Sequence, residues 1–334
     1  MNIRIENKKY YEELIILKGI AIILVVLGHS FSFTGFNILD NNILNRYIHD
    51  SIYSFHMPLF FMIAGFLTNN YEDNLNKKFY FSKIKRLLIP YIFINIVDAI
   101  PRHLFNSLVN NKSNSIERII FYSGAATWFV YTLFLLFLIF PIIEKYIIKK
   151  DKYYLFGLGL FLLNIFEIGS NIKIFTVDRL VYMSFYFYIG YLLKNYYEKI
   201  SGSVKKFNVI YIVIIILFIL YGNFYNEFIL SKIIFPFLGI ISFWYISLKI
   251  KKVENLIYNF LTFCGENSLS FYLLEVFCGT VYRVILIKII PIEYNFLLVL
   301  SFFSLKLISL VIGIKYMVCK NKYFSFLLGA KYKK

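Results

Sequence analysis

Ten apolar segments divide the 334-residue chain, and each has about the length that a helix needs to cross a bilayer. A transmembrane helix requires about 20 predominantly apolar residues. The segments cover residues 14–33, 51–68, 87–105, 127–143, 153–169, 180–196, 207–226, 233–250, 267–287 and 295–317. This pattern predicts an all-α fold, a polytopic membrane bundle of about ten transmembrane helices that forms a single domain over residues 1–334.

The composition excludes an ordinary soluble protein. Hydrophobic residues make up 59% of the chain, charged residues only 16%, and the mean hydropathy is +0.67. Soluble domains are usually about half apolar and about a quarter charged. The first segment is too long for a secretory signal peptide and has no small-residue cleavage site. We therefore expect a multi-pass protein of the cell membrane, surrounded by membrane lipids.

The net charge of +17 comes from lysine and arginine residues that are unevenly distributed. Most of them lie in short runs, in alternate connections and near both ends of the chain. The positive-inside rule places such connections in the cytoplasm, so both termini are expected there, as an even number of spans requires. Since the basic residues form no single patch, no nucleic-acid partner is expected.

The three cysteines are Cys264, Cys278 and Cys319. They show no metal-ligand spacing and are scattered through the last segments. They are expected to be free thiols, and no metal site is expected.

The first segment carries two ionisable residues, Lys18 near its start and His29 near its end. Eleven positions on an α-helix correspond to three turns plus about 20° of rotation and roughly 16 Å of rise, so both residues share a face. Ionisable groups inside a span are costly and commonly functional. Histidine, with an unperturbed pKa of about 6.5, suits proton transfer. Packing against another helix is the alternative for His29.

The second segment contains SFHMPLFFMIAGF, in which His56 should lie at the same depth as His29. A structural role for His56 is as plausible as a catalytic one. Gly65, further along this segment, predicts a close approach of another helix.

The basic run KKFYFSKIKRLLIPY covers residues 77–91. Membrane topology and attraction to anionic headgroups are enough to explain such a run. Read together with Lys18, which projects from the same cytoplasmic side, Lys83 and Arg86 could instead hold the phosphates of a cytoplasmic cofactor.

Two further residues stand out in later segments. Trp128 opens the fourth segment, where an interfacial anchor is the favoured interpretation and substrate contact the alternative. Glu275 lies about nine residues into the ninth helix, where it must find a partner or stay protonated.

Five features resemble the membrane-bound acyltransferase-3 family: the first segment, FHMPLFFMIAGF, the run ending in RLLIPY, TWFVYTLF and NSLSFYLLE. They occur in the family's order over nearly the whole chain. Members are ten-span O-acyltransferases that modify bacterial surface glycans. The family's arginine, ten residues and histidine correspond here to Lys18 and His29. Its Arg-x-x-Arg corresponds to Lys83-x-x-Arg86, and Glu275 stands where a histidine often follows the SLxxYLL motif.

The resemblance implies transfer of an acyl group, most often acetyl, from acetyl-CoA or another acyl-CoA to a sugar hydroxyl of a capsular, other surface or lipid-linked glycan. It implies that His29 is the general base and that His56 or a nearby polar group orients it or stabilises the oxyanion. Lys18, Lys83 and Arg86 would hold the CoA phosphates. A covalent acyl-histidine step stays open. The chain ends soon after the tenth segment, so the stand-alone form without an appended extracytoplasmic domain is expected.

Two other classes of function stay open. A glycan flippase or polymerase can also be a basic polytopic protein, although the chain has no large external loop of the kind expected in a polymerase. A membrane scaffold or sensor that has lost catalysis is compatible with lysine at positions 18 and 83 and glutamate at position 275. Binding or hydrolysis of acyl-CoA would separate an enzyme from both classes.

Overall fold

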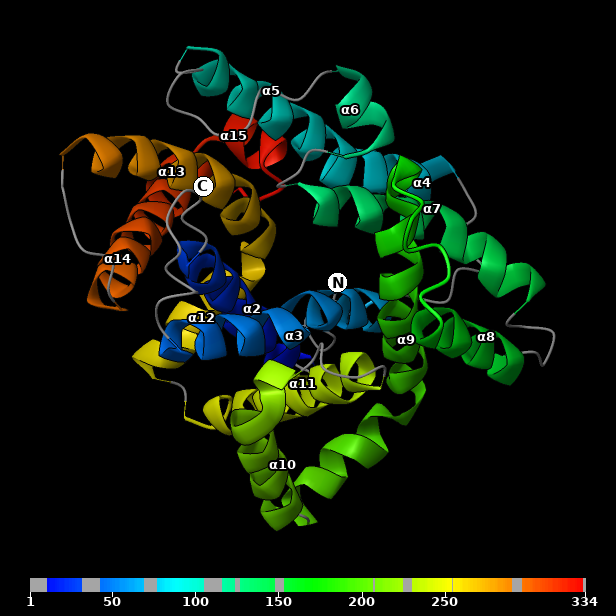
Figure 1. Cartoon of the computed structure of the whole chain (residues 1–334). Coiled ribbons are helices and arrows are strands. Elements are labelled where there is room, and N and C mark those ends of the chain that lie inside the picture. The colour runs from blue at the N-terminus through cyan, green and yellow to red at the C-terminus, as the bar shows by residue number, and fades with distance from the viewer. Residues whose placement is uncertain are drawn as a thin grey trace. The chain divides into compact units, whose positions relative to one another are not determined.

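The computed structural model of the chain describes residues 11–31, 43–68, 77–104, 116–123, 127–147, 153–206, 208–224, 230–253, 255–289 and 296–332. Within these residues all regular secondary structure is helical, as predicted (Figure 1). The chain forms two compact units. The first comprises Met1–Phe60 and Tyr197–Lys320, and the second comprises Phe61–Tyr196 and Asn321–Lys334.

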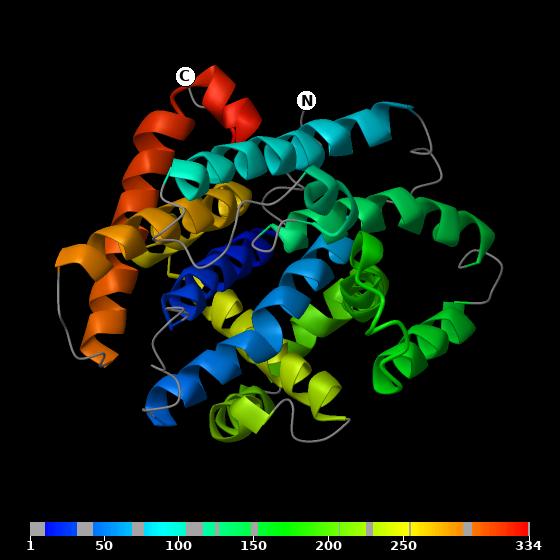
Figure 2. The same ribbon diagram turned by 45° about the horizontal axis from the view of Figure 1, so that its top comes forward.

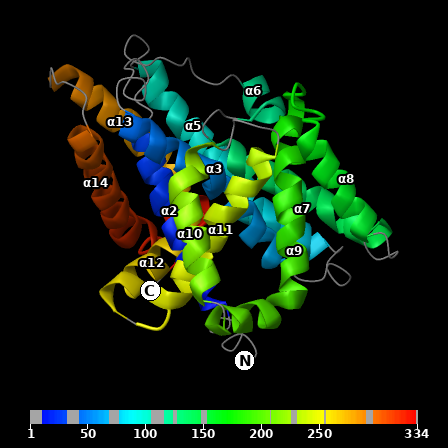
Figure 3. The same ribbon diagram turned by 60° about the horizontal axis from the view of Figure 1, so that its bottom comes forward.

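The first unit is built around α2. Its helices are α2 (Glu12–Phe31), the first part of α3 (Ile43–Phe66), the end of α9 (Val177–Lys206), α10 (Asn208–Tyr221), a 3-10 turn (Gly222–Phe224), α11 (Ser231–Ile250), α12 (Leu256–Glu266), α13 (Ser268–Ile289), α14 (Phe296–Ile312) and a π-helix (Gly313–Val318). Helices α11, α12, α13 and α14 all pack against α2, and α10 packs against α11 (Figure 3). Helix α13 also packs against α14 (Figure 2). The central position of α2 explains why most of its residues are buried.

The second unit contains the basic run. Its helices are the rest of α3, α4 (Lys77–Lys83), a π-helix (Ile84–Leu88), α5 (Ile89–Leu104), α6 (Ile116–Phe121), α7 (Trp128–Tyr146), α8 (Tyr153–Ile165), a 3-10 turn (Ile174–Thr176), the first part of α9 and α15 (Lys322–Leu327). Helix α15, near the end of the chain, packs against α5 (Figure 2). The π-helix that follows α4 packs against α7.

The ten predicted segments correspond, in their described parts, to the helices α2, α3, α5, α7, α8, α9, α10, α11, α13 and α14; residues 32–33, 105, 207, 225–226 and 295 of these segments lie outside the described residues. Among the residues that the structure describes, four helical runs are long and apolar enough to cross a membrane, namely α2, α7, α11 and Phe296–Val318. The number of spans and the side of each terminus stay predictions. Helix α8 ends at Ile165, before the predicted end at residue 169, because Glu167 and Gly169 have positive φ angles of 51° and 87°. Such angles lie outside the right-handed helical region.

Glycines allow α2 and α12 to touch through their backbones. A Cβ atom at Gly19 would lie 2.0 Å from the carbonyl oxygen of Leu261, and a Cβ atom at Gly265 would lie 1.9 Å from that of Ile15. Small residues are typical of such close helix contacts in membrane proteins. Helix α12 itself begins at a side-chain cap, because Asn255 accepts a hydrogen bond from the backbone amide of Tyr258.

The close approach predicted at Gly65 is confirmed within the second unit. A Cβ atom at Gly65 would lie 1.9 Å from the carbonyl oxygen of Phe187, and one at Gly190 would lie 1.9 Å from that of Met62. The partner is α9, which the position of Gly65 in the sequence could not identify. Helices α3 and α9 therefore touch in the same way as α2 and α12: one glycine on each helix lies against the backbone of the other.

The start of α2 is fixed by a buried carboxylate. Glu13 is fully buried and accepts a hydrogen bond from the hydroxyl of Tyr197. Its other oxygen pairs with Lys251, with an Nζ–Oε2 distance of 2.7 Å. Because a buried charge is costly unless it is paired and hydrogen-bonded, these contacts hold the first turn of α2 in place.

We predict that Gly19→Ala destabilises the protein, because its Cβ would collide with the backbone of Leu261 rather than with a flexible side chain. Overpacking of this kind costs about 1–3 kcal/mol. The measurement is the thermal unfolding midpoint of the purified protein in detergent. Gly159→Ala in α8 is the matched control, because a Cβ there meets nothing within 4 Å. Equal midpoints for the two variants would contradict the packing described for α2 and α12.

Candidate functional site

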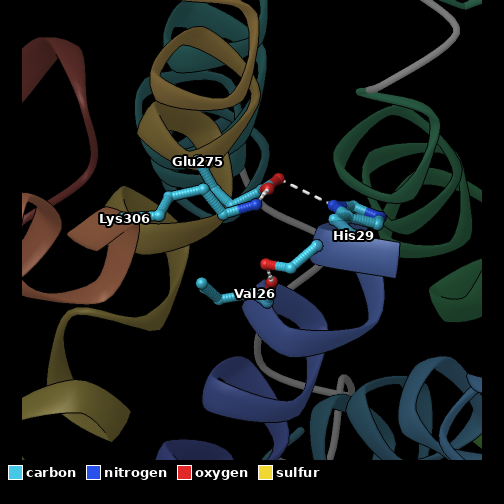
Figure 4. A network of polar contacts seen from close by, with 5 residues as sticks. Val26, His29, Glu275 and Lys306 are labelled. Atoms are coloured by element: carbon cyan, nitrogen blue, oxygen red, sulfur yellow. Dashed lines mark hydrogen bonds and ion pairs between the residues drawn. The ribbon is translucent and has the colours of Figure 1, made fainter. Parts of the chain in front are cut away.

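His29 lies in the last turn of α2 and contacts a carboxylate from α13. Its Nδ1 atom is 2.7 Å from Oε2 of Glu275, a residue 246 positions away in the sequence (Figure 4). The His29 side chain is 32% exposed, whereas that of Glu275 is only 3% exposed. The contact therefore joins a buried carboxylate to a histidine whose side chain is partly exposed at the protein surface.

Glu275 has a second partner that the sequence analysis missed. Lys306 of α14 donates a hydrogen bond from Nζ to Oε1 of Glu275, and the lysine side chain is 1% exposed (Figure 4). The sequence predicted that Glu275 must find a partner or stay protonated, and the structure gives it two. The sequence does mark Lys306, because it is the one charged residue of the strongly apolar helix α14.

The arrangement assigns different roles to the two nitrogens of the His29 ring. Nδ1 is engaged by Glu275, and the described residues make no hydrogen bond to Nε2. A carboxylate that accepts the Nδ1 proton orients the ring and stabilises the imidazolium that forms when Nε2 takes up a proton. Such an arrangement can serve proton transfer at Nε2.

His56 is differently placed. It is buried, and its Nδ1 atom is 2.7 Å from the carbonyl oxygen of Ile52, one turn earlier in α3. The ring of Tyr53 lies beside both histidines, with centroid distances of 6.4 Å to His29 and 5.0 Å to His56. The described residues show no hydrogen bond between the two histidines. This geometry favours the structural alternative for His56, and its predicted catalytic role stays a prediction.

Lys18 lies on α2, as predicted, and is partly buried. It precedes Gly19, the residue at which α2 and α12 touch. Three turns of helix separate it from His29, so the axial distance of roughly 16 Å inferred from the spacing applies to a real, continuous helix. Its predicted contact with phosphates stays a prediction.

Lys83 and Arg86 belong to the second unit, where α4 ends and the π-helix begins. The Nζ atom of Lys83 lies 3.5 Å from the centre of the Phe137 ring on α7, which is a cation–π contact. Burial, followed by repulsion from Arg86, lowers the pKa of Lys83 to about 8. Arg86 is exposed and can receive an anion.

Trp128 is the first residue of α7, as predicted. The guanidinium of Arg179 lies 4.6 Å from its ring centre, and the ring of Phe61 stacks with it at 6.4 Å. These contacts explain the residue as part of the packing of the second unit. Its alternative role in substrate contact stays a prediction.

Comparison with known proteins gives two kinds of match. Nodulation protein NolL of Sinorhizobium fredii is 49% identical over 53 residues, which are 16% of this chain and 14% of that protein. The "Probable poly-beta-1,6-N-acetyl-D-glucosamine export protein" of Staphylococcus aureus is 22% identical over 228 residues, 62% of this chain and 63% of that protein. The chain thus spans less than two thirds of each of these relatives. No solved structure matches it.

A family model covers far more of the chain than these relatives do. The acyltransferase-3 model, described as an acyltransferase domain, matches residues 11–314. This range includes α2 with His29, the basic run, Trp128, Glu275 and Lys306. The match and the four apolar helices agree with the resemblance seen in the sequence motifs. The chain therefore belongs to the acyltransferase-3 family of membrane-bound acyltransferases.

Proposed function

We propose that this protein transfers an acyl group, most simply acetyl, from a cytoplasmic acyl-CoA to a sugar hydroxyl of a cell-surface polysaccharide. Family membership supports acyl transfer. The name of the Staphylococcus aureus relative refers to a polymer of N-acetylglucosamine, which supports a glycan as acceptor. The observation that carries the proposal is the 2.7 Å contact between His29 and the buried carboxylate of Glu275.

The proposed chemistry uses the Nε2 atom of His29. Nε2 accepts the proton of the sugar hydroxyl while the hydroxyl oxygen attacks the thioester carbonyl of the donor. The C–S bond then breaks, and the thiolate of CoA takes the proton back from His29. Glu275 stabilises the imidazolium between these two steps. General-base catalysis of this kind contributes about 10²–10⁴-fold to the rate. A covalent acyl-histidine route would use the same nitrogen as nucleophile.

Lys83 and Arg86 are proposed to contact phosphates of the CoA donor. Arg86 is exposed and offers a planar fork of N–H donors, whereas Lys83 offers a single positive charge. Lys18, in the other unit, keeps its predicted role as a further phosphate ligand and can be tested on its own. Both proposals place the donor on the cytoplasmic side of a multi-pass protein in the plasma membrane.

Replacing His29 with alanine is expected to abolish O-acylation. The loss of the base should lower the rate of acyl transfer about 10²–10⁴-fold. The measurement is the acyl content of surface polysaccharide, by mass spectrometry, in cells whose membranes contain equal amounts of wild-type and variant protein. Ser30→Ala is the matched control, because the neighbouring Ser30 hydroxyl donates its hydrogen bond to the carbonyl oxygen of Val26 within the same helix.

Unchanged acylation in the His29→Ala strain would contradict the proposed mechanism. Export without acyl transfer is the second candidate, since the Staphylococcus aureus relative is named an export protein. It would be favoured if the His29→Ala strain lost surface polysaccharide while the remaining polymer kept its acyl content.

The affinity for acyl-CoA is expected to fall as the pH rises through about 8. The pKa of Lys83 is about 8, so above this pH the side chain becomes neutral and no longer attracts a phosphate. A charged hydrogen bond of this kind is worth about 1.5–3 kcal/mol, or roughly tenfold or more in affinity. The measurement is acyl-CoA binding to purified protein between pH 7 and pH 9.

Lys83→Arg should flatten this pH dependence, because arginine stays charged throughout the range. Lys85→Arg is the matched control and should leave the pH dependence unchanged, because Lys85 is exposed two positions away and contacts the ring of Phe81. The same pH dependence in wild type and Lys83→Arg would show that Lys83 does not contact the donor.

A further inference from the structure

Lys306 is a buried cation that the proposed reaction does not yet use. It lies within α14, is 1% exposed, and has its Nζ atom 5.3 Å from the centre of the Phe302 ring. Its ion-pair partner is Glu275. Gly279, one turn after Glu275 on α13, lies beside this pair, since a Cβ there would be 3.8 Å from Oε1 and 4.0 Å from Nζ. A charged lysine buried in an apolar helix is costly, which makes a functional role worth testing.

We propose that Lys306 is a positioning residue that fixes the tautomer of His29: it holds Glu275 as a carboxylate, which keeps the ring proton on Nδ1 and leaves Nε2 free to accept a proton. This inference rests on the proposed function, in which Nε2 of His29 is the base.

The charges and protons of Lys306, Glu275 and His29 depend on one another. With Lys306 present, the ammonium and the carboxylate neutralise each other, and a neutral imidazole can donate its Nδ1 proton to Oε2 of Glu275. Without Lys306, an isolated carboxylate in an apolar environment attracts a proton. If Glu275 takes that proton, its hydroxyl donates to Nδ1 and the ring proton moves to Nε2. If His29 takes it, the imidazolium carries protons on both nitrogens. Either way, Nε2 can no longer act as a base.

Other titratable groups of the first unit near this site have partners of their own. The Nδ1 atom of His49 in α3 lies 2.8 Å from Oδ1 of Asp50. Its ring stacks on that of Tyr53 with a centroid distance of 4.1 Å and meets the ring of Phe31 edge-on. The other titratable groups of the described side chains on α3 and on the helices packed against α2 are Arg46, Tyr47, Tyr53 and His56 of α3, Lys232, Tyr245 and Lys249 of α11, Lys251 and Lys252 directly after it, Tyr258, Cys264 and Glu266 of α12, and Tyr272, Cys278 and Tyr282 of α13. Tyr282 is bonded to Ser309, Lys251 pairs with Glu13, and Tyr258 donates to Glu12. Among the described residues, the side chains that pair with Glu275 are thus Lys306 and His29.

The test observes the ring proton directly and does not depend on acyl transfer. Nitrogen-15 NMR of labelled histidine in lipid nanodiscs distinguishes a protonated ring nitrogen from a bare one, and the spectrum of His29→Gln identifies the signals of His29. In wild type at pH 7 we expect a proton on Nδ1 and a bare Nε2. In Lys306→Gln, which keeps a hydrogen-bond donor but loses the charge, we expect a proton on Nε2.

Acyl transfer provides the second readout. The pH of half-maximal activity in Lys306→Gln should move upward by about two units, which corresponds to one charge at short range. Activity at pH 7 should fall at least about tenfold and recover towards pH 9. Lys306→Arg should stay within about threefold of wild type because it keeps the charge. Lys315→Met, in the π-helix after α14, is the matched control for loss of a cation.

A bare Nε2 in Lys306→Gln at pH 7 would overturn the inference, and so would an equal loss of activity at every pH with an unchanged tautomer. If Lys306→Gln is not recovered from membranes, Lys306→Met is measured in its place with the same criteria. A tautomer that switches as expected in a protein without acyl transfer would support the inference about the proton while refuting the proposed function.

Discussion

A carboxylate buried among apolar helices is the constraint on which the first unit depends. Glu275 is 2% exposed, and both of its oxygens are occupied, one by His29 and the other by Lys306. Burying one charge alone would be costly, whereas a paired and hydrogen-bonded group can be accommodated. The pairing joins α2, near the start of the chain, to α13 and α14, which follow one another near its end. The electrostatic requirement and the helix packing therefore specify the same arrangement.

Close backbone contact supplies the precision that such a network needs. Gly19 and Gly265 bring α2 and α12 together until carbonyl oxygens occupy the space that side chains would fill. Helix α2 is then held at its first turn by the buried Glu13 and at its last turn by the contact of His29. A helix fixed at both ends and in the middle has little freedom to rotate, which matters for a histidine that must present one nitrogen.

The sequence predicted much of the helical framework and only part of the site. Length and hydropathy located ten helices, but they missed α12, because a helix of 11 residues is too short to be read as a span. Ionisable residues in apolar segments identified His29 and Glu275 separately. Helical periodicity tells which residues share a face of one helix and says nothing about the helix that lies opposite. The contact between His29 and Glu275, which are 246 positions apart, could therefore not be predicted from the sequence. Lys306 is, like Glu275, an ionisable residue in an apolar segment, so the same criterion identifies it.

The fixed ends of α2 also limit how this helix can change in evolution. Each residue added to an α-helix rotates everything beyond it by about 100° and advances it by about 1.5 Å. A single insertion or deletion between Gly19 and His29 would therefore swing the imidazole away from α13, even if every side chain in the helix were kept. Substitutions along this stretch are limited by the size and polarity of the new side chain. A change in its length, by contrast, would break the contact between His29 and Glu275. Changes in chain length are tolerated in connecting loops, where no such register exists.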